Sequence, residues 1–153
     1  MSSADAVAQL TLDSFGYGRV ALIRATQLNT AGNAVIAIPL LGGGLTNGGA
    51  VANSGGVIIR RITIQNPSGS IASANVSITT SNDGNISNAV VANVVLSTVS
   101  AAGRFQDLTI AGAYGANTAV SGNTTSALYV NINTASGNSN TADIAVFGEV
   151  VSF

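Results

Sequence analysis

The sequence contains no cysteine, histidine, lysine or tryptophan, and only 7% of its 153 residues are charged. Without cysteine the chain has no disulfide, no thiolate nucleophile and no cysteine-ligated metal site. Without histidine it lacks the usual general base and the commonest zinc ligand. Without lysine it has neither a Schiff-base residue nor the lysine of a phosphate-binding loop. These absences predict a protein that is not an enzyme and that needs no cofactor or metal.

Charged and aromatic residues are too sparse for the common modes of nucleic-acid and membrane binding. Five arginines, five aspartates and one glutamate give a net charge of −1, so no strong field attracts nucleic acid or an anionic membrane. Aromatic residues make up 5% of the chain, too few for a platform on which bases stack. The most apolar segment, residues 20–41, is interrupted by polar side chains and falls short of the roughly 20 apolar residues of a membrane span. We therefore expect no nucleic acid, membrane or small-molecule substrate as a partner.

The first ten residues do not read as a secretion signal. They contain no basic residue, and Asp5 occupies the region where the apolar part of a signal peptide would lie. The sequence therefore predicts synthesis and folding in the cytoplasm.

Hydrophobic residues make up 46% of the chain, and most are alanine, valine or isoleucine set among glycine, serine, threonine and asparagine. This mixture favours β-strands and turns over helices. Alternation with a period of two predicts half-buried antiparallel strands. The clearest predicted strands are residues 71–80, 127–133 and 142–150. Less regular strands are predicted at 19–28, 34–41, 57–65, 89–98 and 104–110, with a further candidate at 9–15.

About eight short strands without a convincing helix predict an all-β fold, an antiparallel β-sandwich with jelly-roll topology favoured. Residues 1–16 are expected to be an N-terminal arm that orders only against a partner, and residues 17–153 a single domain. Two segments rich in glycine and asparagine, 42–56 and 112–125, are expected to be long connections that serve as interaction surfaces. Low charge with many β-branched residues also predicts that copies of the chain or a partner cover much of its surface.

Arg60 and Arg61 form the one local concentration of charge. In a regular strand one side chain of the pair would point to each face, so one must leave the core face or meet an acid there. One interpretation is structural, with an ion pair to Asp107 or Asp143, or a β-bulge. The other interpretation is a contact with an acidic surface of a partner.

The set of strands after residue 18 resembles the small decoration, or cement, proteins on the heads of tailed bacteriophages. The similarity is closest in residues 126–132 (SALYVNI) and 142–150 (ADIAVFGEV), and residues 57–64 (VIIRRITI) are also similar to a strand of such proteins. The resemblance implies a protein on the outer surface of the virion, often a homotrimer, that binds an assembled icosahedral head. It would clamp neighbouring major capsid protein subunits against the pressure of the packaged DNA, with no enzymatic activity.

On this interpretation the candidate capsid-contact residues are Arg60, Arg61, Gly43 and Asn47, with residues 2–16 and 42–56 as further contact segments. Several weak contacts that are linked in one molecule raise the effective affinity by orders of magnitude.

Two other classes of protein remain open from the sequence. One is a different virion structural protein, either a jelly-roll coat subunit or a module of a head or tail fibre. A coat subunit that faces the genome usually carries a basic arm, which this chain lacks. The other class is a carbohydrate-binding or adhesin-like β-sandwich on a bacterial surface. Sugar sites often use exposed aromatic side chains, and tryptophan is missing here.

Overall fold

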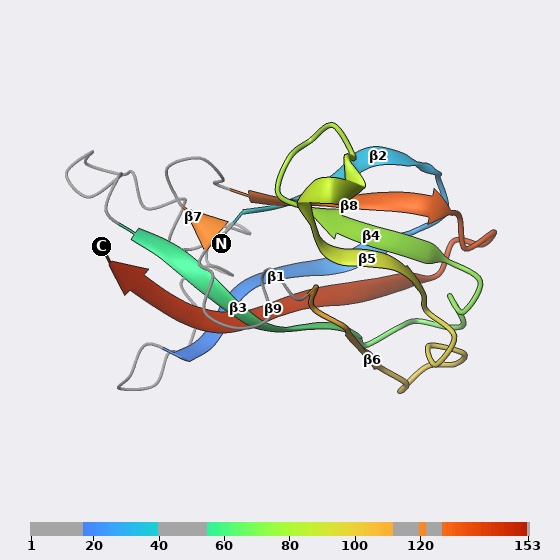
Figure 1. Ribbon diagram of the computed structural model, residues 1–153. Coiled ribbons are helices and arrows are strands. Elements are labelled where there is room, and N and C mark those ends of the chain that lie inside the picture. The colour runs from blue at the N-terminus through green and yellow to red at the C-terminus, as the bar shows by residue number, and fades with distance from the viewer. Residues whose placement is uncertain (1–16, 40–54, 112–119, 122–126, 153) are drawn as a thin grey trace, which may run out of the picture.

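Residues 17–39, 55–111, 120–121 and 127–152 are described by a computed structural model (Figure 1). They form nine β-strands and one short 3-10 helix. The strands are β1 (Tyr17–Gln27), β2 (Gly32–Pro39), β3 (Gly55–Gln65), β4 (Asn75–Thr79), β5 (Ala89–Val95), β6 (Gln106–Leu108), β7 (Val120–Ser121), β8 (Ala127–Thr134) and β9 (Thr141–Ser152), and the helix η1 is Ile86–Asn88.

The strands pair into two antiparallel sheets. Sheet A has the order β1-β9-β3-β6, with the two-residue strand β7 beside the start of β3, and sheet B has the order β2-β8-β4-β5. Figure 1 shows the two sheets stacked face to face, with sheet B above sheet A. The prediction of an all-β antiparallel sandwich is confirmed, and the jelly-roll topology stays a prediction. The strand β7 lies within a segment that the sequence predicted to be only a connection.

The core lies between the two sheets and consists mainly of isoleucine, valine and leucine. The predicted inward positions Leu128, Val130 and Ile132 of β8, and Ala142, Ile144 and Val146 of β9, are buried. The largest fully buried side chains are Leu28, Ile38, Ile59, Ile62, Ile64, Ile71, Ile78, Leu96, Leu128, Ile132 and Ile144. Burial of such side chains stabilises the sandwich by about 1.5–3 kcal/mol each relative to exposure.

The strands β4 and β5 are shorter than the predicted strands 71–80 and 89–98. The beginning of the first predicted strand and the end of the second form turns instead. The amide of Ala74 donates to the carbonyl of Ile71 (3.0 Å), and the amide of Val99 donates to that of Leu96 (2.8 Å). Two further backbone bonds of 2.9 Å, Ile71 to Val99 and Leu96 to Ala74, join these turns. In each turn the two buried residues are three positions apart, whereas buried residues of a strand are two apart. The four buried side chains are those of Ile71, Ala74, Leu96 and Val99.

A β-bulge in β3 places Arg60 and Arg61 on the same face of sheet A. Residues Gly148 and Phe147 of β9 lie opposite Ile59 and Arg61, which leaves Arg60 as the extra residue of β3. Both arginines are exposed, whereas the isoleucines on either side of the pair are buried. Of the structural alternatives that the sequence left open, the bulge is confirmed, and it takes both arginines off the core face.

The bulge depends on the absence of a side chain at Gly148. A Cβ atom at this position would clash with the carbonyl oxygen of Ile58 on the neighbouring strand. We therefore expect Gly148→Ala to lower the free energy of unfolding by about 1–3 kcal/mol, the usual cost of overpacking. Equilibrium unfolding in urea measures this change. The exposed control Ser97→Ala should change it by less than about 0.5 kcal/mol, and equal stability of both variants would contradict the geometry.

Candidate functional site

Charged residues are divided unequally between the two sheets. The strands of sheet B contain none of the charged residues within the described ranges, whereas those of sheet A contain seven. The seven are Arg19, Arg24, Arg60, Arg61, Asp107, Asp143 and Glu149. The two others that the structure describes, Asp83 and Arg104, lie in connections between strands. The strands of sheet B therefore carry no charge, and those of sheet A carry seven; near sheet B the one described charge is Asp83 in the connection 80–88.

Arg60 and Arg61 each contact a side chain of β9 on the outer face of sheet A. The Nε and Nη2 atoms of Arg60 lie 3.2 and 3.3 Å from the two carboxylate oxygens of Glu149, a two-bond arrangement that suits a guanidinium. The guanidinium carbon of Arg61 lies 4.3 Å from the centroid of the Phe147 ring, within the range of a cation–π interaction. Both arginines are thus held against β9 while remaining accessible to solvent.

The predicted ion pair of the arginines with Asp107 or Asp143 was wrong, because both aspartates have other partners. Asp107 accepts a hydrogen bond from the hydroxyl of Thr63, its neighbour on β3. Asp143 accepts from the amide of Ala25 (2.8 Å) and from the side chain of Asn66 (3.2 Å). These bonds tie the ends of β1 and β3 to β9 and leave Glu149 as the acid nearest to the bulge.

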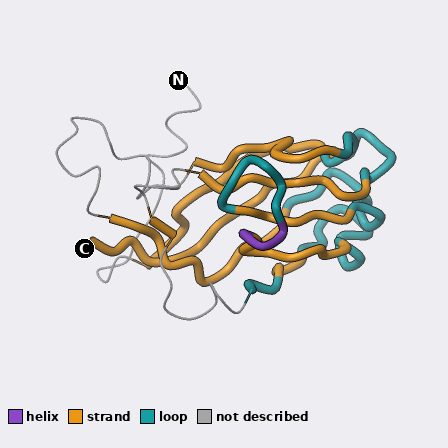
Figure 2. Tube along the Cα trace, turned by 45° about the horizontal axis from the view of Figure 1, so that its top comes forward, coloured by secondary structure: helices purple, strands orange, loops and turns teal. Residues whose placement is uncertain are grey.

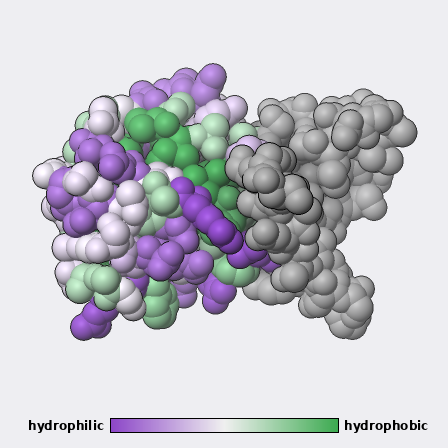
Figure 3. Space-filling view, turned by 180° about the vertical axis from the view of Figure 1, so that it is seen from behind, coloured by the Kyte–Doolittle hydropathy of each residue, from purple (hydrophilic) through white to green (hydrophobic). Residues whose placement is uncertain are grey.

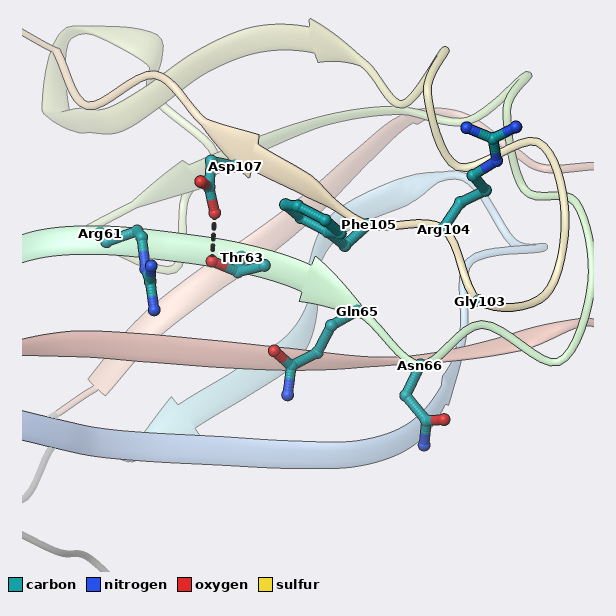
Figure 4. Close-up of a pocket in the computed structure, with 8 residues that line it drawn as sticks. All are labelled: Arg61, Thr63, Gln65, Asn66, Gly103, Arg104, Phe105 and Asp107. Atoms are coloured by element: carbon teal, nitrogen blue, oxygen red, sulfur yellow. Dashed lines mark hydrogen bonds between the residues drawn. The ribbon is translucent and has the colours of Figure 1, made fainter.

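A hollow of about 450 Å³ lies on the charged side, between β3 and the turn that leads into β6 (Figure 4). It is lined by Arg61, Thr63, Gln65, Asn66, Gly103, Arg104, Phe105 and Asp107. The side chain of Phe105 is 62% exposed, which is unusual for a residue of this size and hydrophobicity. Sequence reasoning missed this hollow; the one signal for it was a phenylalanine between charged and polar neighbours at 103–107.

The outer face of sheet B carries amides and small apolar side chains. The amide of Asn133 on β8 donates to Asn93 on β5 (2.8 Å) and to Asn75 on β4 (3.4 Å). Beside this row, Val95 is 48% exposed. A surface of this kind can be covered by another protein without removing an ion from water.

Part of the same face is covered by the connection 80–88, which contains η1. Figures 1 and 2 show this connection on the outer side of sheet B. Its Asp83 carbonyl accepts a hydrogen bond from Asn33 (3.3 Å), which ties the connection to β2. Beneath it, the amide of Asn131 donates to the hydroxyl of Thr79 (3.0 Å), and both side chains are buried. The buried polar groups of this region are therefore paired.

Apolar side chains also reach the surface along the edge formed by β1 and β2. Val35 is 41% exposed, and Ile23 and Ile36 are only partly buried against the core. Figure 3, which views the molecule from behind, shows a hydrophobic patch among hydrophilic residues.

Two of the four predicted contact residues, Arg60 and Arg61, lie together on the outer face of sheet A. The other two, Gly43 and Asn47, lie outside the described residues, as do residues 1–16. The prediction that these residues contact a capsid stays a prediction.

Within the described ranges, no group of three or more His, Cys, Asp or Glu side chains could hold a metal ion. No helix in this part of the chain is long and apolar enough to cross a membrane. Comparisons with protein-family models, with curated proteins and with solved structures found no match for this chain.

The contact of Arg60 with Glu149 should contribute little to stability, because the two side chains are 32% and 35% exposed. We expect a double-mutant cycle with Arg60→Gln and Glu149→Gln to give a coupling free energy of about 0.2–1 kcal/mol, measured by urea unfolding. A coupling several times larger would show that the pair is a structural requirement of the bulge.

Asp83 should make the stability of the protein depend on pH in acid. The hydroxyl of Ser81 and the amide of Asn85 donate to its carboxylate and hold the pKa of Asp83 below its ordinary value of 3.8. Because the folded state favours the carboxylate, this contribution is present above the ordinary pKa and is lost as the pH falls through the folded pKa. We expect Asp83→Asn to unfold at a lower temperature than the natural chain at pH 7. The difference should shrink below pH 3.8, and a constant difference would contradict this assignment.

Proposed function

We propose that this chain is a structural virion protein that binds the outer surface of an icosahedral phage head. In this role it stabilises the head by clamping neighbouring major capsid protein subunits, as a homotrimer and without enzymatic activity or a cofactor. The observation that carries the proposal is the unequal distribution of charge, with none in the strands of sheet B and seven charged residues in those of sheet A.

The distribution of charge favours sheet B as the face that meets other proteins. Removing a charged side chain from water costs several kcal/mol unless it finds a well-placed partner. The buried centres of protein interfaces are accordingly depleted in charged residues. The amides of Asn75, Asn93 and Asn133 can form hydrogen bonds across such an interface, and Val95 supplies apolar contact area. Sheet A would then remain in contact with water.

The attachment points of the predicted contact segments support several linked contacts. Tyr17 pairs with Glu149 and Gly55 pairs with Ser152, so the start of β1, the start of β3 and the end of β9 are neighbours. The end of β2 and the start of β8 also meet, and Figure 1 places all these strand ends at one end of the sandwich. The predicted contact segments 2–16 and 42–56 are connected to these strand ends, so contacts from both would act together.

The proposed topology of the sandwich is a jelly roll. If the two-residue β7 is set aside, the first strand pairs with the last, the second with the second last, and so on inward. The pairs are β1 with β9, β2 with β8, β3 with β6, and β4 with β5. Such nesting is what results when one long antiparallel hairpin is rolled up into two sheets. Jelly rolls occur in viral capsid and lectin domains, which supports a virion role by analogy only.

A charge placed on the outer face of sheet B tests the proposal. We expect Val95→Glu to weaken binding to heads that lack the protein by at least about tenfold, because an unpaired carboxylate would be buried. Sedimentation of the full-length protein with purified heads measures the binding, and its mass in solution reports whether the trimer persists. The matched control is Thr109→Glu, which adds the same charge at an exposed residue after β6.

The predicted contact through Arg60 and Arg61 would use the opposite face and can be separated from this one. If sheet B faces the shell, the double variant Arg60→Ser, Arg61→Ser folds and binds heads as the natural chain does. Loss of binding in this variant, with Val95→Glu unaffected, would place the contact on sheet A and contradict the assignment to sheet B. No binding of the natural chain to heads would contradict the proposed function itself.

A further inference from the structure

The hollow beside β6 combines two cations with an aromatic ring. In Figure 4 Phe105 lies between the backbone positions of Arg61 and Arg104. The side chain of Arg104 extends away from the ring on one side, and the side chains of Arg61, Gln65 and Asn66 extend to the other side. Asp107 is the one acid that lines it, so the lining carries a net positive charge although the chain as a whole carries −1. The hollow therefore attracts anions locally.

Both arginines have hydrogen-bond donors available to a ligand. The guanidinium of Arg104 forms no hydrogen bond or ion pair with any residue that the structure describes. Arg61 stacks on Phe147, a contact that fixes the guanidinium but uses none of its N–H donors. A guanidinium in this state binds a carboxylate through two parallel hydrogen bonds.

The exposed position of Phe105 is fixed by its backbone and its neighbours. The hydroxyl of Thr98 donates to the carbonyl of Phe105 (3.1 Å) and to the side chain of Gln106 (2.8 Å). The amide of Gln106 in turn donates to the carbonyl of Val95 (2.9 Å), and the amide of Arg104 donates to Ala101 (3.2 Å). The backbone of the turn that presents the phenyl ring to solvent is thus held by hydrogen bonds before any ligand binds, which lowers the cost of ordering on binding.

We propose that this hollow binds an acidic saccharide, a chain of sugar units that carry carboxylates. The apolar face of a sugar ring would pack on Phe105, as aromatic side chains accept apolar surfaces. Carboxylates on either side of that ring would bind Arg61 and Arg104, and the amides of Gln65 and Asn66 would bind hydroxyl groups. This site goes beyond the proposed function, because it lies on the sheet that faces water when sheet B contacts the head.

The side chains that line the hollow suit an acidic saccharide better than a single-stranded nucleic acid, which is also a polymer with repeated negative charge. The lining contains a single aromatic ring and so offers one stacking position, whereas single-stranded nucleic acids are bound by successive aromatic side chains along a groove. The amide and carboxylate side chains of the lining match the many hydroxyl groups of a sugar. The prediction from the sequence that no small-molecule substrate is bound is unaffected, because the ligand is a polymer segment that is held and not converted.

The test compares one sugar backbone with and without its charge. The full-length protein is titrated by calorimetry with a galacturonic acid hexamer and with the same hexamer after complete methyl esterification. We expect the acid to bind at least about tenfold more tightly than the ester and to weaken as salt is added, because the carboxylates supply the charge that the arginines recognise. No binding of the acid, or equal binding of both, overturns the proposal.

Variants at the hollow separate a specific site from a general effect of charge. We expect Arg104→Gln and Phe105→Ser each to weaken binding of the acid by at least about fivefold, since each removes one predicted contact. The matched control is Arg24→Gln, which removes an exposed arginine from β1 at the opposite edge of sheet A. It should bind the acid as the natural chain does. Tighter binding of a single-stranded DNA hexamer than of the acid, or equal losses in all three variants, would also overturn the proposal.

Discussion

The pairing of β9 with two neighbours along its length is the constraint on which sheet A depends. On one side β9 pairs with β1, and on the other side it pairs with β3. The same strand fixes the charged residues of its neighbours. Glu149 binds Arg60, Phe147 stacks on Arg61, and Asp143 bonds the end of β3. The absence of a side chain at Gly148 lets the bulge of β3 approach, so the orientation of the arginine pair follows from β9.

The sequence was sufficient to predict elements that repeat with one period. Leu128 and Ile132 in β8, and Ile144 and Val146 in β9, recur with a period of two and are buried as expected. The predictions were wrong where the period changes. At residues 71–74 and 96–99 the buried residues are three positions apart, in two turns that are joined by backbone hydrogen bonds. The alternation of apolar and polar residues along the sequence cannot predict a bond between two distant turns.

The candidate surfaces were harder to predict, because they depend on which strands become neighbours. The charged residues of each predicted strand can be counted in the sequence, but only the pairing order shows that the seven in the described strands all belong to sheet A. The hollow joins Arg61 and Gln65 to Phe105, and no local spacing connects residues so far apart. The bulge that turns Arg60 and Arg61 to one face needs Gly148, which lies far away along the chain.

The two faces of the sandwich suit two different surroundings. An uncharged face can be buried against protein without removing ions from water, while a charged face with an open hollow remains effective only in solvent. A protein on the outside of a head would need both faces at once. Its linked contact segments at one end of the sandwich would add affinity without a large buried area.

The proposed function is tested most directly by a cryo-EM map of virus particles from the source that encodes the chain. The account predicts density for the sandwich on the outside of an icosahedral head, at fixed symmetry positions, with sheet B toward protein and sheet A toward solvent. Density inside the shell or along a fibre, or none on the head, would contradict it.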